Sequence, residues 1–290
     1  MKVIFTLISL ILISSFASAS NLENRVITYV DNLANSLGDN LSNIFKKSDR
    51  VKYLDLSIGV KEHLKPTISV MNVNKIAESS KGAFFNQNSL SLHDNDQTVN
   101  VGFGHRSLMY DDKLMVGVNI FFDYAFDEQH QRQGAGLEFI SSSFDLRGNY
   151  YDATSGIQNV GGGNTEEALD GWDSRLDFHL PLEYDVRLFG SIFEFENAAG
   201  NYELDGEKYG INAIIDRLNL EIGYIDDNKT GDGTFANISY QIPIGNQYEK
   251  KSSAITEYVS VKDRLYEPVK RENKIRVVRI SAANIVVSGF

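Results

Sequence analysis

The five histidines are the first residues to test for chemistry, because imidazole can act as a base or a metal ligand near neutral pH. No histidine belongs to a Gly-x-Ser-x-Gly turn, which presents a catalytic serine, or to the His-Glu-x-x-His pattern of zinc proteases. The sequence contains no cysteine, so it offers no thiol nucleophile and no disulfide. We therefore predict no enzyme and no catalytic residue. The histidines are His63, His93, His105, His130 and His179.

Two other segments imitate ligand-binding motifs. Residues 226–232 have oxygen-bearing side chains at alternate positions and a glycine sixth, as calcium loops do, but the twelfth position is Asn237 instead of a bidentate glutamate. Three consecutive glycines, Gly161 to Gly163, lack the Lys-Ser or Lys-Thr that follows a phosphate-binding loop. We interpret the first segment as a polar hairpin loop and the second as a flexible loop. We expect no metal ligand and no cofactor.

The charged residues of 114–180 instead follow a period of two. Apolar residues such as Val118, Leu137 and Leu176 alternate with charged residues, asparagine or glycine. Because side chains on a strand point to opposite faces at each step, every segment is a ribbon with one apolar and one polar face. If the ribbons close into a barrel in lipid, the polar face lines the lumen. The predicted lumen-facing residues are Asn119, Asp123, Gly134, Gly136, Glu138, Arg147, Asp173, Arg175 and Asp177.

The same period extends over most of the chain from Lys52 and predicts twelve strands. Most are as long as the roughly 9–11 residues that a tilted strand needs to cross a bilayer. The second and third alternate poorly, and in the ninth we place a β-bulge near Gly190. The predicted strands are 52–60, 66–74, 83–92, 98–106, 114–125, 133–142, 144–152, 171–180, 184–195, 207–215, 217–226 and 233–242.

The connectors favour a membrane barrel over a soluble β-sandwich. From residue 143 onward, brief connectors alternate with long polar ones, of which 153–170 is the longest. Outer-membrane barrels have short turns at one end and long loops at the other, whereas a sandwich has no reason to sort loops in this way. The connector at 75–82 is longer than the rule predicts. We predict an all-β fold, a transmembrane antiparallel β-barrel of about twelve strands over residues 51–242.

The N-terminal part indicates export. Residues 1–19 have the lysine, apolar run and small-residue end of a signal peptide. Residues 20–50 carry an apolar stripe of helical spacing, which predicts a short periplasmic helix leading into the barrel. No later stretch reaches 18 uninterrupted apolar residues, so we expect no helical membrane span. The net charge of −11 argues against nucleic-acid binding. We expect the outer membrane of a Gram-negative-type bacterium, with its lipid as a partner.

Residues 243–290, which we call the tail, break the pattern. They hold nine lysines or arginines and five acids, so the tail carries +4 and the remainder of the chain −15. A basic tail inside an acidic lumen would be held by charge complementarity and would close the lumen to ions. The alternative is a solvated periplasmic tail, and charge alone does not decide between the two. If the tail threads the lumen, we expect contacts from Arg264, Lys270, Arg271 and Lys274.

Several spaced motifs in a fixed order resemble the translocator domain of the intimin and invasin family. They are Asn-Val-Gly-Phe-Gly-His-Arg at 100–106, Met-Val-Gly-Val-Asn-Ile-Phe-Phe-Asp-Tyr at 115–124, Arg-Gln-Gly-Ala-Gly-Leu-Glu-Phe at 132–139, Leu-Arg-Gly-Asn-Tyr-Tyr at 146–151 and Gly-Trp-Asp-Ser-Arg at 171–175. The tail segment 264–275, Arg-Leu-Tyr-Glu-Pro-Val-Lys-Arg-Glu-Asn-Lys-Ile, is similar to the family's segment just after the barrel. The resemblance covers about residues 51–280.

The resemblance implies an inverse autotransporter. In that family, the chain after the last strand returns through the lumen and carries an adhesive passenger to the cell surface. It also implies the barrel-assembly machinery and periplasmic chaperones as partners. Here the matching tail stops about fifteen residues before Phe290, and we expect no passenger domain in that space. We predict a barrel that anchors and exports its C-terminal segment, adhesin- or invasin-like, with an unknown receptor. The alternative is a passenger-less structural or channel-type barrel.

Overall fold

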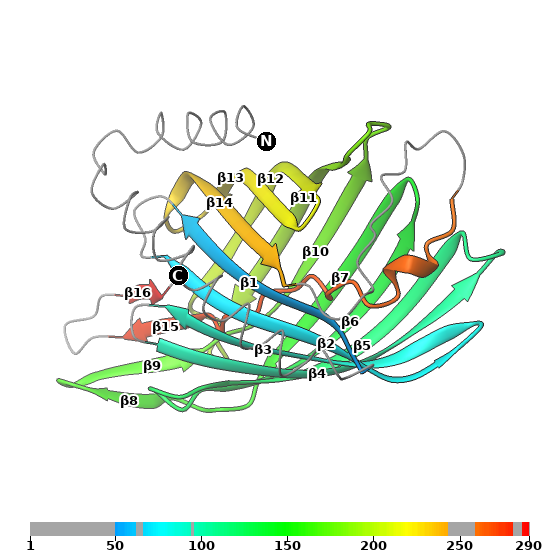
Figure 1. Ribbon diagram of the computed structural model, residues 1–290. Helices are drawn as coiled ribbons and strands as arrows, with labels where there is room; N and C mark the ends of the chain where they lie inside the picture. Colours follow the sequence, from blue (N-terminus) through cyan, green and yellow to red (C-terminus); the bar gives the residue numbers. More distant parts are fainter. Residues whose placement is uncertain (1–49, 62–65, 94–95, 243–258, 281–285, 290) are drawn as a thin grey trace. The chain divides into compact units, whose positions relative to one another are not determined.

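The computed structural model describes residues 50–61, 66–93, 96–242, 259–280 and 286–289 (Figure 1). The signal peptide expected at 1–19 lies outside the described residues, as does all of the expected 20–50 lead-in except residue 50. None of the helices among the described residues is long and apolar enough to cross a membrane. The account below concerns the barrel and the described part of the tail.

The described strands include twelve that close into an antiparallel barrel, with β14 paired to β1 (Figure 1). All twelve predicted strands are present, so the predicted fold is confirmed. The barrel strands are β1 (Val51–Lys61), β2 (Thr67–Ser79), β3 (Gly82–His93), β4 (Asp96–Met109), β5 (Leu114–Ala125), β6 (Gln131–Ser141), β7 (Phe144–Ala153), β10 (Asp170–His179), β11 (Asp185–Glu196), β12 (Glu203–Ile215), β13 (Leu218–Asp227) and β14 (Gly231–Gln241).

The two ends of the barrel differ in their connections. We call the end at which β1 starts and β14 stops the turn end, and the opposite end the loop end. At the turn end the longest connection is 180–184, and three connections have only two residues. At the loop end β7 and β10 are joined by residues 154–169, which contain two further strands. The predicted sorting of loop lengths is therefore present.

Two local predictions were wrong. The connector expected at 75–82 is a two-residue turn at 80–81, because β2 continues through a β-bulge between Lys75 and Ala77. The bulge breaks the alternation, and the strand therefore resembled a loop. No register shift occurs at Gly190, where β10 and β11 pair without interruption. The irregularity there has another cause: Phe189, Phe193 and Phe195 are buried inside the barrel, so both faces of β11 are apolar.

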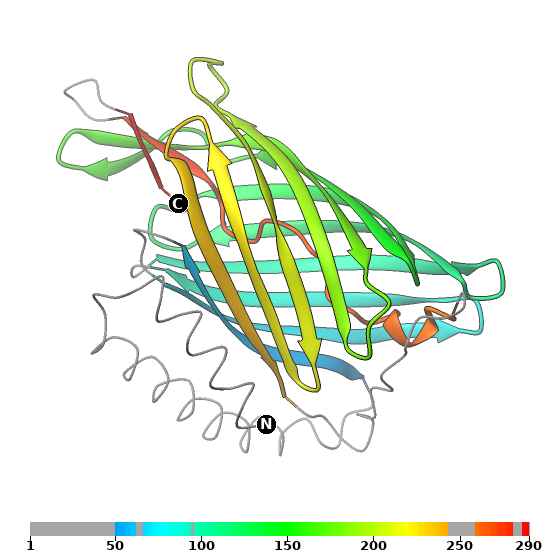
Figure 2. The same ribbon diagram turned by 90° about the horizontal axis from the view of Figure 1, so that it is seen from above.

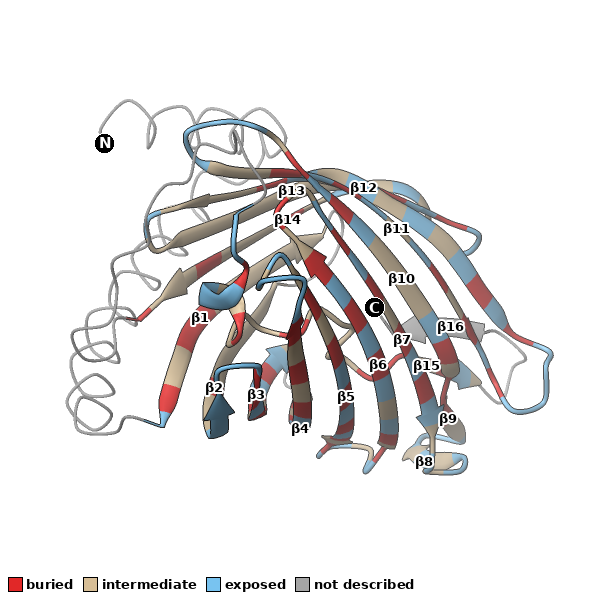
Figure 3. Ribbon diagram, turned by 90° about the vertical axis from the view of Figure 1, so that its right-hand side faces the viewer, coloured by how far each residue is buried: buried red, intermediate tan, exposed pale blue. Residues whose placement is uncertain are grey.

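Burial alternates along the strands, as Figure 3 shows by the red and blue bands. In β5, Asn119 and Asp123 are buried, whereas Val118 is 49% exposed. In β6, Glu138 is buried and Leu137 is 55% exposed. Exposed apolar side chains therefore cover the outside of the barrel, where lipid would solvate them, and charged ones point inward. This inversion of the usual globular pattern is what a membrane barrel requires.

The outer face of β2 and β3 departs from this rule. Asn72, Asn74, Asn86 and Asn88 share it and bond to one another, for example Asn74 Nδ2 to Asn86 Oδ1 at 3.0 Å and Asn88 Nδ2 to Asn86 Oδ1 at 2.7 Å. The inner face carries buried Val73 and Phe85 instead. Four amides that satisfy one another avoid most of the cost of unpaired polar groups. Their positions explain why the sequence pattern was weak in these two strands.

Four short strands form a second sheet at the loop end (Figure 1). They are β8 (Gln158–Gly161), β9 (Asn164–Ala168), β15 (Val277–Ile280) and β16 (Val286–Gly289), in the order β16-β15-β9-β8. We call this the loop-end sheet. It joins the longest loop to the tail, since β15 pairs antiparallel with β9. The sequence analysis predicted the loop but none of these strands.

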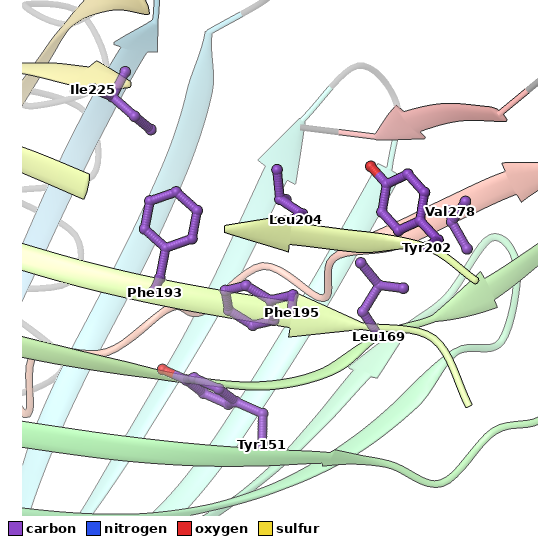
Figure 4. Packing of buried hydrophobic residues seen from close by; sticks show 8 residues of the cluster. All are labelled: Tyr151, Leu169, Phe193, Phe195, Tyr202, Leu204, Ile225 and Val278. Atoms are coloured by element: carbon purple, nitrogen blue, oxygen red, sulfur yellow. The ribbon is translucent and has the colours of Figure 1, made fainter. Parts of the chain in front are cut away.

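An apolar cluster fills the loop end of the lumen (Figure 4). Phe193 and Phe195 from β11 meet Leu204 from β12, Ile225 from β13 and Val278 from the tail. At the turn end, Val261 and Leu265, which flank the short 3-10 helix η1 (Lys262–Arg264), join a second cluster with Met115 and Ile140. Tail and barrel therefore share buried apolar contacts at both ends of the lumen.

Candidate functional site

Residues 261–276 of the tail run along the lumen, as Figure 2 shows in orange and red. At the turn end, the Val261 N–H donates to the Asp112 carbonyl at 2.7 Å. At the loop end, the Leu169 N–H donates to the Arg276 carbonyl at 2.9 Å. Between Val261 and Arg276, side chains of the tail form charge pairs with the barrel wall. Side chains of the wall also form hydrogen bonds with the main chain of the tail.

Asp123 on β5 is the first of three wall aspartates that each bind one tail cation. Arg271 of the tail donates to it twice, at 2.8 and 2.6 Å. Arg132 of the wall donates through Nε at 2.8 Å, and Asn100 adds a bond at 2.7 Å. The exposed fraction of Asp123 and Arg132 is 0%. A buried charge is tolerated only when it is paired and hydrogen-bonded, and this carboxylate has four donors.

Asp145 and Asp177 repeat the arrangement nearer the turn end. Arg264 of the tail donates to both oxygens of Asp145, at 2.9 and 2.5 Å. Lys270 of the tail lies 3.2 Å from Asp177 Oδ1. The wall residue Arg147 connects the two sites, at 3.1 Å from Asp145 and 3.0 Å from Asp177. Each of these two aspartates therefore binds one tail cation and two wall arginines, Arg147 and Arg187 at Asp145, and Arg147 and Arg175 at Asp177.

The charge match is made pair by pair and not by an overall acidic lumen. Among the described residues, two pairs have the reverse sign: Arg187 of the wall binds Glu267 of the tail at 3.0 Å, and Lys208 of the wall lies 3.9 Å from Glu272 of the tail. Arg106, on β4 of the wall and fully buried, binds Glu138 on β6, two strands away. The predicted lumen face already included Arg147 and Arg175 among its acids, and both pair with a wall acid here. The barrel wall therefore recognises the tail by the position of each charge.

The nine residues predicted to face the lumen all lie on the inner face. Asn119, Asp123, Glu138, Arg147 and Asp177 are buried, and Asp173 and Arg175 are half-buried among inner side chains. A Cβ at Gly134 would lie 3.3 Å from Arg271, and one at Gly136 would lie 2.6 Å from Asn119. Gly134 thus leaves room for a tail side chain, whereas Gly136 leaves room for wall amides. Of the four tail residues, Lys274 contributes its carbonyl, which accepts from Arg132 at 3.1 Å.

Several residues that hold the tail were not predicted. Arg132 was assigned to a connector, although it shares parity with Gly134, Gly136 and Glu138 and could have been found from that signal. Asn100, Gln87, Asn149 and Tyr151 touch the tail main chain, and no local sequence pattern identifies such contacts. They become visible only when the barrel closes and the tail is in place.

The tail does not fill the lumen. A cavity of about 1430 Å³ remains beside it, on the side of β12, β13, β14, β1 and β2. Hydroxyl and amide side chains such as Ser57, Ser69, Ser239 and Asn237 line that side, and the tail lines the other. We call the two sides the open wall and the tail-binding wall, the latter formed by β3 to β7, β10 and the turn-end part of β11, which carries Arg187. We expected the tail by itself to close the lumen, but its atoms leave this space empty.

The loop-end sheet fixes the end of the tail. Arg279 Nε of β15 donates to Glu166 Oε1 of β9 at 2.5 Å. Burial raises the pKa of the Glu166 carboxyl, but the adjacent His130 and Arg279 lower it below its ordinary value overall, so it is ionised at neutral pH. Glu167, also buried, accepts from Asn197 Nδ2 at 3.1 Å and so joins the sheet to the β11–β12 loop. The sheet is thus attached to two neighbouring loops.

The chemical motifs considered in the sequence have structural explanations. Asp227 accepts the N–H groups of Lys229 and Thr230, so the calcium-like segment is a hairpin turn capped by an aspartate. Gly161, Gly162 and Gly163 all have positive φ angles, which the β8–β9 turn requires. Among the described residues the histidines do not form one group, and His105 stacks on Phe84 of the outer face.

Ser155, His130 and Glu166 nevertheless lie in a row. Ser155 Oγ is 3.2 Å from His130 Nδ1, and His130 Nε2 is 3.5 Å from Glu166 Oε2. His130 is buried, and Glu166 is also paired with Arg279. None of the three lines the lumen cavity. The row therefore connects the β5–β6 loop to the loop-end sheet.

Residues 14–273 match the protein family described as "Inverse autotransporter, beta-domain". A search of curated proteins found no match. Among solved structures, a membrane protein from a study of in-meso crystallization has a TM-score of 0.67 at 19% identity, over 78% of this chain and 98% of that one. The KdgM porin (TM-score 0.46, 6% identity, 66% and 99% coverage) and the β-domain of the Bordetella autotransporter BrkA (0.37, 10%, 68% and 100%) are more distant.

Proposed function

Because the chain belongs to the inverse autotransporter β-domain family, and is thus a Gram-negative outer-membrane barrel, we propose that it anchors and exports its own C-terminal segment. In this proposal the loop end faces the exterior. The segment after β14 enters at the turn end, crosses beside the tail-binding wall and emerges where β15 joins the loop-end sheet. The proposal assigns the protein no catalytic role.

One observation carries the proposal: the tail is bound along the whole lumen and not only at one mouth. Arg264 pairs near the turn end, Arg271 pairs near the loop end, and β15 pairs beyond it. A periplasmic tail would have no use for three wall aspartates aimed into the lumen. Outer-membrane lipid is the partner of the exposed apolar face. The barrel-assembly machinery, periplasmic chaperones and a surface receptor remain expectations from the family.

An epitope tag tests the direction of export. We place the tag after Phe290 and label intact cells, expecting the same signal as in permeabilised cells. The matched control carries the tag in the two-residue turn at 80–81, at the turn end, and should be labelled only after permeabilisation. If the tag after Phe290 is hidden in intact cells, the tail is not exported.

The large cavity favours a second candidate, a channel-type barrel. A cavity of about 1430 Å³ with a hydroxyl-rich wall would admit water and small solutes beside the tail. The channel candidate predicts steady conductance of the full chain in planar bilayers together with a hidden C-terminal tag. The exporter predicts a surface tag, and, because the apolar cluster at the loop end narrows the exit, low conductance that rises when the tail is deleted.

A further inference from the structure

We propose that the tail-binding wall is a binding site for the main chain of an extended polypeptide and therefore accepts segments whose side chains differ from those of the native tail. This inference rests on the proposed export function and names its substrate class. Nothing in the family match or the charge pairs requires it. It follows from which atoms of the tail the wall touches.

Two buried arginines supply the strongest contacts. Arg106 donates through one terminal nitrogen to the carbonyls of Leu265 and Glu267, at 2.9 and 2.5 Å. Arg132 donates to the carbonyls of Glu272 and Lys274, at 2.6 and 3.1 Å. Both guanidinium groups have an exposed fraction of 0% and are held by wall carboxylates on their other edge. They are therefore oriented toward the tail before it arrives.

Neutral side chains bind the main chain between these points. Gln87 accepts from the Val269 N–H at 2.8 Å and donates to the Val269 carbonyl at 3.4 Å, as a neighbouring strand would. Asn149 donates to the Lys270 carbonyl, and Asn100 to the Asn273 carbonyl. Tyr151 accepts from the Glu272 N–H at 2.7 Å. Over residues 265–274 the wall thus binds seven carbonyl oxygens and two N–H groups.

Main-chain groups carry no information about sequence. Every residue has a carbonyl, and every residue except proline has an N–H, so these contacts suit almost any extended segment. Strand-addition sites in other proteins gain affinity in the same way, with specificity left to side-chain pockets. Here the charge pairs of Arg264 and Arg271 would set the register of the tail along the wall. The main-chain hydrogen bonds would bind almost any extended segment.

The cavity gives side chains of other sizes room beside the tail. Glu267, Pro268, Lys270, Glu272, Asn273 and Lys274 all border the space beside the tail. A close-packed interior would reject side chains of another size at these positions. Because about 1430 Å³ is empty there, larger or smaller side chains can point away from the wall while the main chain keeps its bonds.

The test uses the purified, folded full chain and measures the rate of trypsin cleavage after Arg271. In one variant the six cavity-bordering residues are all changed to serine, which also removes the pairs of Glu267 with Arg187 and of Lys270 with Asp177, whereas Arg264 and Arg271 stay. We expect cleavage within about threefold of the unaltered chain, because the main-chain bonds remain. In a second variant, R106K/R132K, the charges facing Glu138 and Asp123 remain but the forked donors are lost. We expect cleavage at least tenfold faster.

The control is R175K, since Arg175 pairs with the wall acids Asp177 and Glu221, and the change should leave cleavage unchanged. If the six-serine variant is cleaved as fast as R106K/R132K, side chains hold the tail and the inference is wrong. Should R106K/R132K fail to fold, the six-serine variant decides alone, because its barrel is unaltered. Trypsin protection in purified protein does not depend on export, so this result and the epitope-tag result can fail separately.

Discussion

The two walls of the lumen are built from the same strand geometry but do different things. The tail-binding wall carries Asp123, Asp145 and Asp177 with buried arginines, and each of these groups is committed to a partner. The open wall carries mainly serine and asparagine, which bond locally, as Ser57 and Ser69 do at 2.6 Å. Among its charged groups, Glu221 pairs with Arg175, and Lys208 lies 3.9 Å from Glu272 of the tail. Charged groups are needed where a segment must be held, because a buried charge pair fixes position strongly.

The comparison also explains how one barrel can bind a chain without trapping it. Neutral hydroxyls and amides form weak, interchangeable bonds with water, so the open wall offers no fixed register. The tail-binding wall offers a fixed register at three aspartates. A lumen with as many charge pairs to the tail on both sides would hold the tail from every direction and leave no room beside it. Four substitutions test this distinction between the two walls.

The largest expected effect comes from Asp123→Ala. The change leaves Arg132 and Arg271 buried without their carboxylate, which should lower the free energy of unfolding by about 3–5 kcal/mol. The matched change on the open wall, Ser239→Ala, should cost about 1 kcal/mol or less. Unfolding can be followed in denaturant by the fluorescence of Trp172, the only tryptophan. Equal costs at the two positions would contradict the distinction between the walls.

On the lipid side, a charged substitution should cost the same unfolding free energy behind either wall. Leu137→Arg lies behind the tail-binding wall and Ile211→Arg behind the open wall, and both positions are at least 50% exposed. Each substitution should cost about 2–4 kcal/mol of unfolding free energy near the bilayer midplane. Asn119→Ala, on the inner face, should cost much less. Refolding into lipid bilayers measures the unfolding free energy of all three variants. A cost for Leu137→Arg as small as that for Asn119→Ala would contradict the assignment of the two faces.

Added volume should be tolerated by the open wall only. Gly136→Leu would push a side chain into Asn119 and Asn149, whose side-chain oxygens lie 2.6 and 2.7 Å from a Cβ at that position. Overpacking of this kind should cost about 1–3 kcal/mol. Ser57→Leu points into the cavity and should change stability by less than about 1 kcal/mol. The same denaturant measurement applies, and a large cost for Ser57→Leu would show that the cavity is not open space.

The smallest effect concerns the loop-end sheet, which ties the tail to the tail-binding side. Glu166→Gln removes the charge facing Arg279, which is 48% exposed in its side chain, so we expect a loss of about 1 kcal/mol or less. Hydrogen exchange at the β9 and β15 amides should become a few times faster, while exchange in β5 stays unchanged. Faster exchange throughout the barrel would mean that the sheet is part of the barrel core.

The sequence by itself determined the barrel and the faces of most strands. Alternation at Val118 and Asn119, or Leu137 and Glu138, records which face each residue takes, because the side-chain period of a strand is two. Where the alternation was irregular, the prediction of strand bounds and faces failed for a local physical reason. A bulge at Lys75 and Ala77 shifted the parity, asparagines took the lipid face of β2 and β3, and phenylalanines took the lumen face of β11.

Only the tertiary structure decided how the tail is held. The tail's cations could be counted in the sequence, but their partners could not, because Arg271 and Asp123 lie 148 residues apart. No local period encodes a contact at that distance, and none marks a side chain such as Arg106 that binds main-chain carbonyls. The same holds for β9 and β15, two short strands that become a sheet only because barrel closure brings the longest loop to the mouth where the tail emerges.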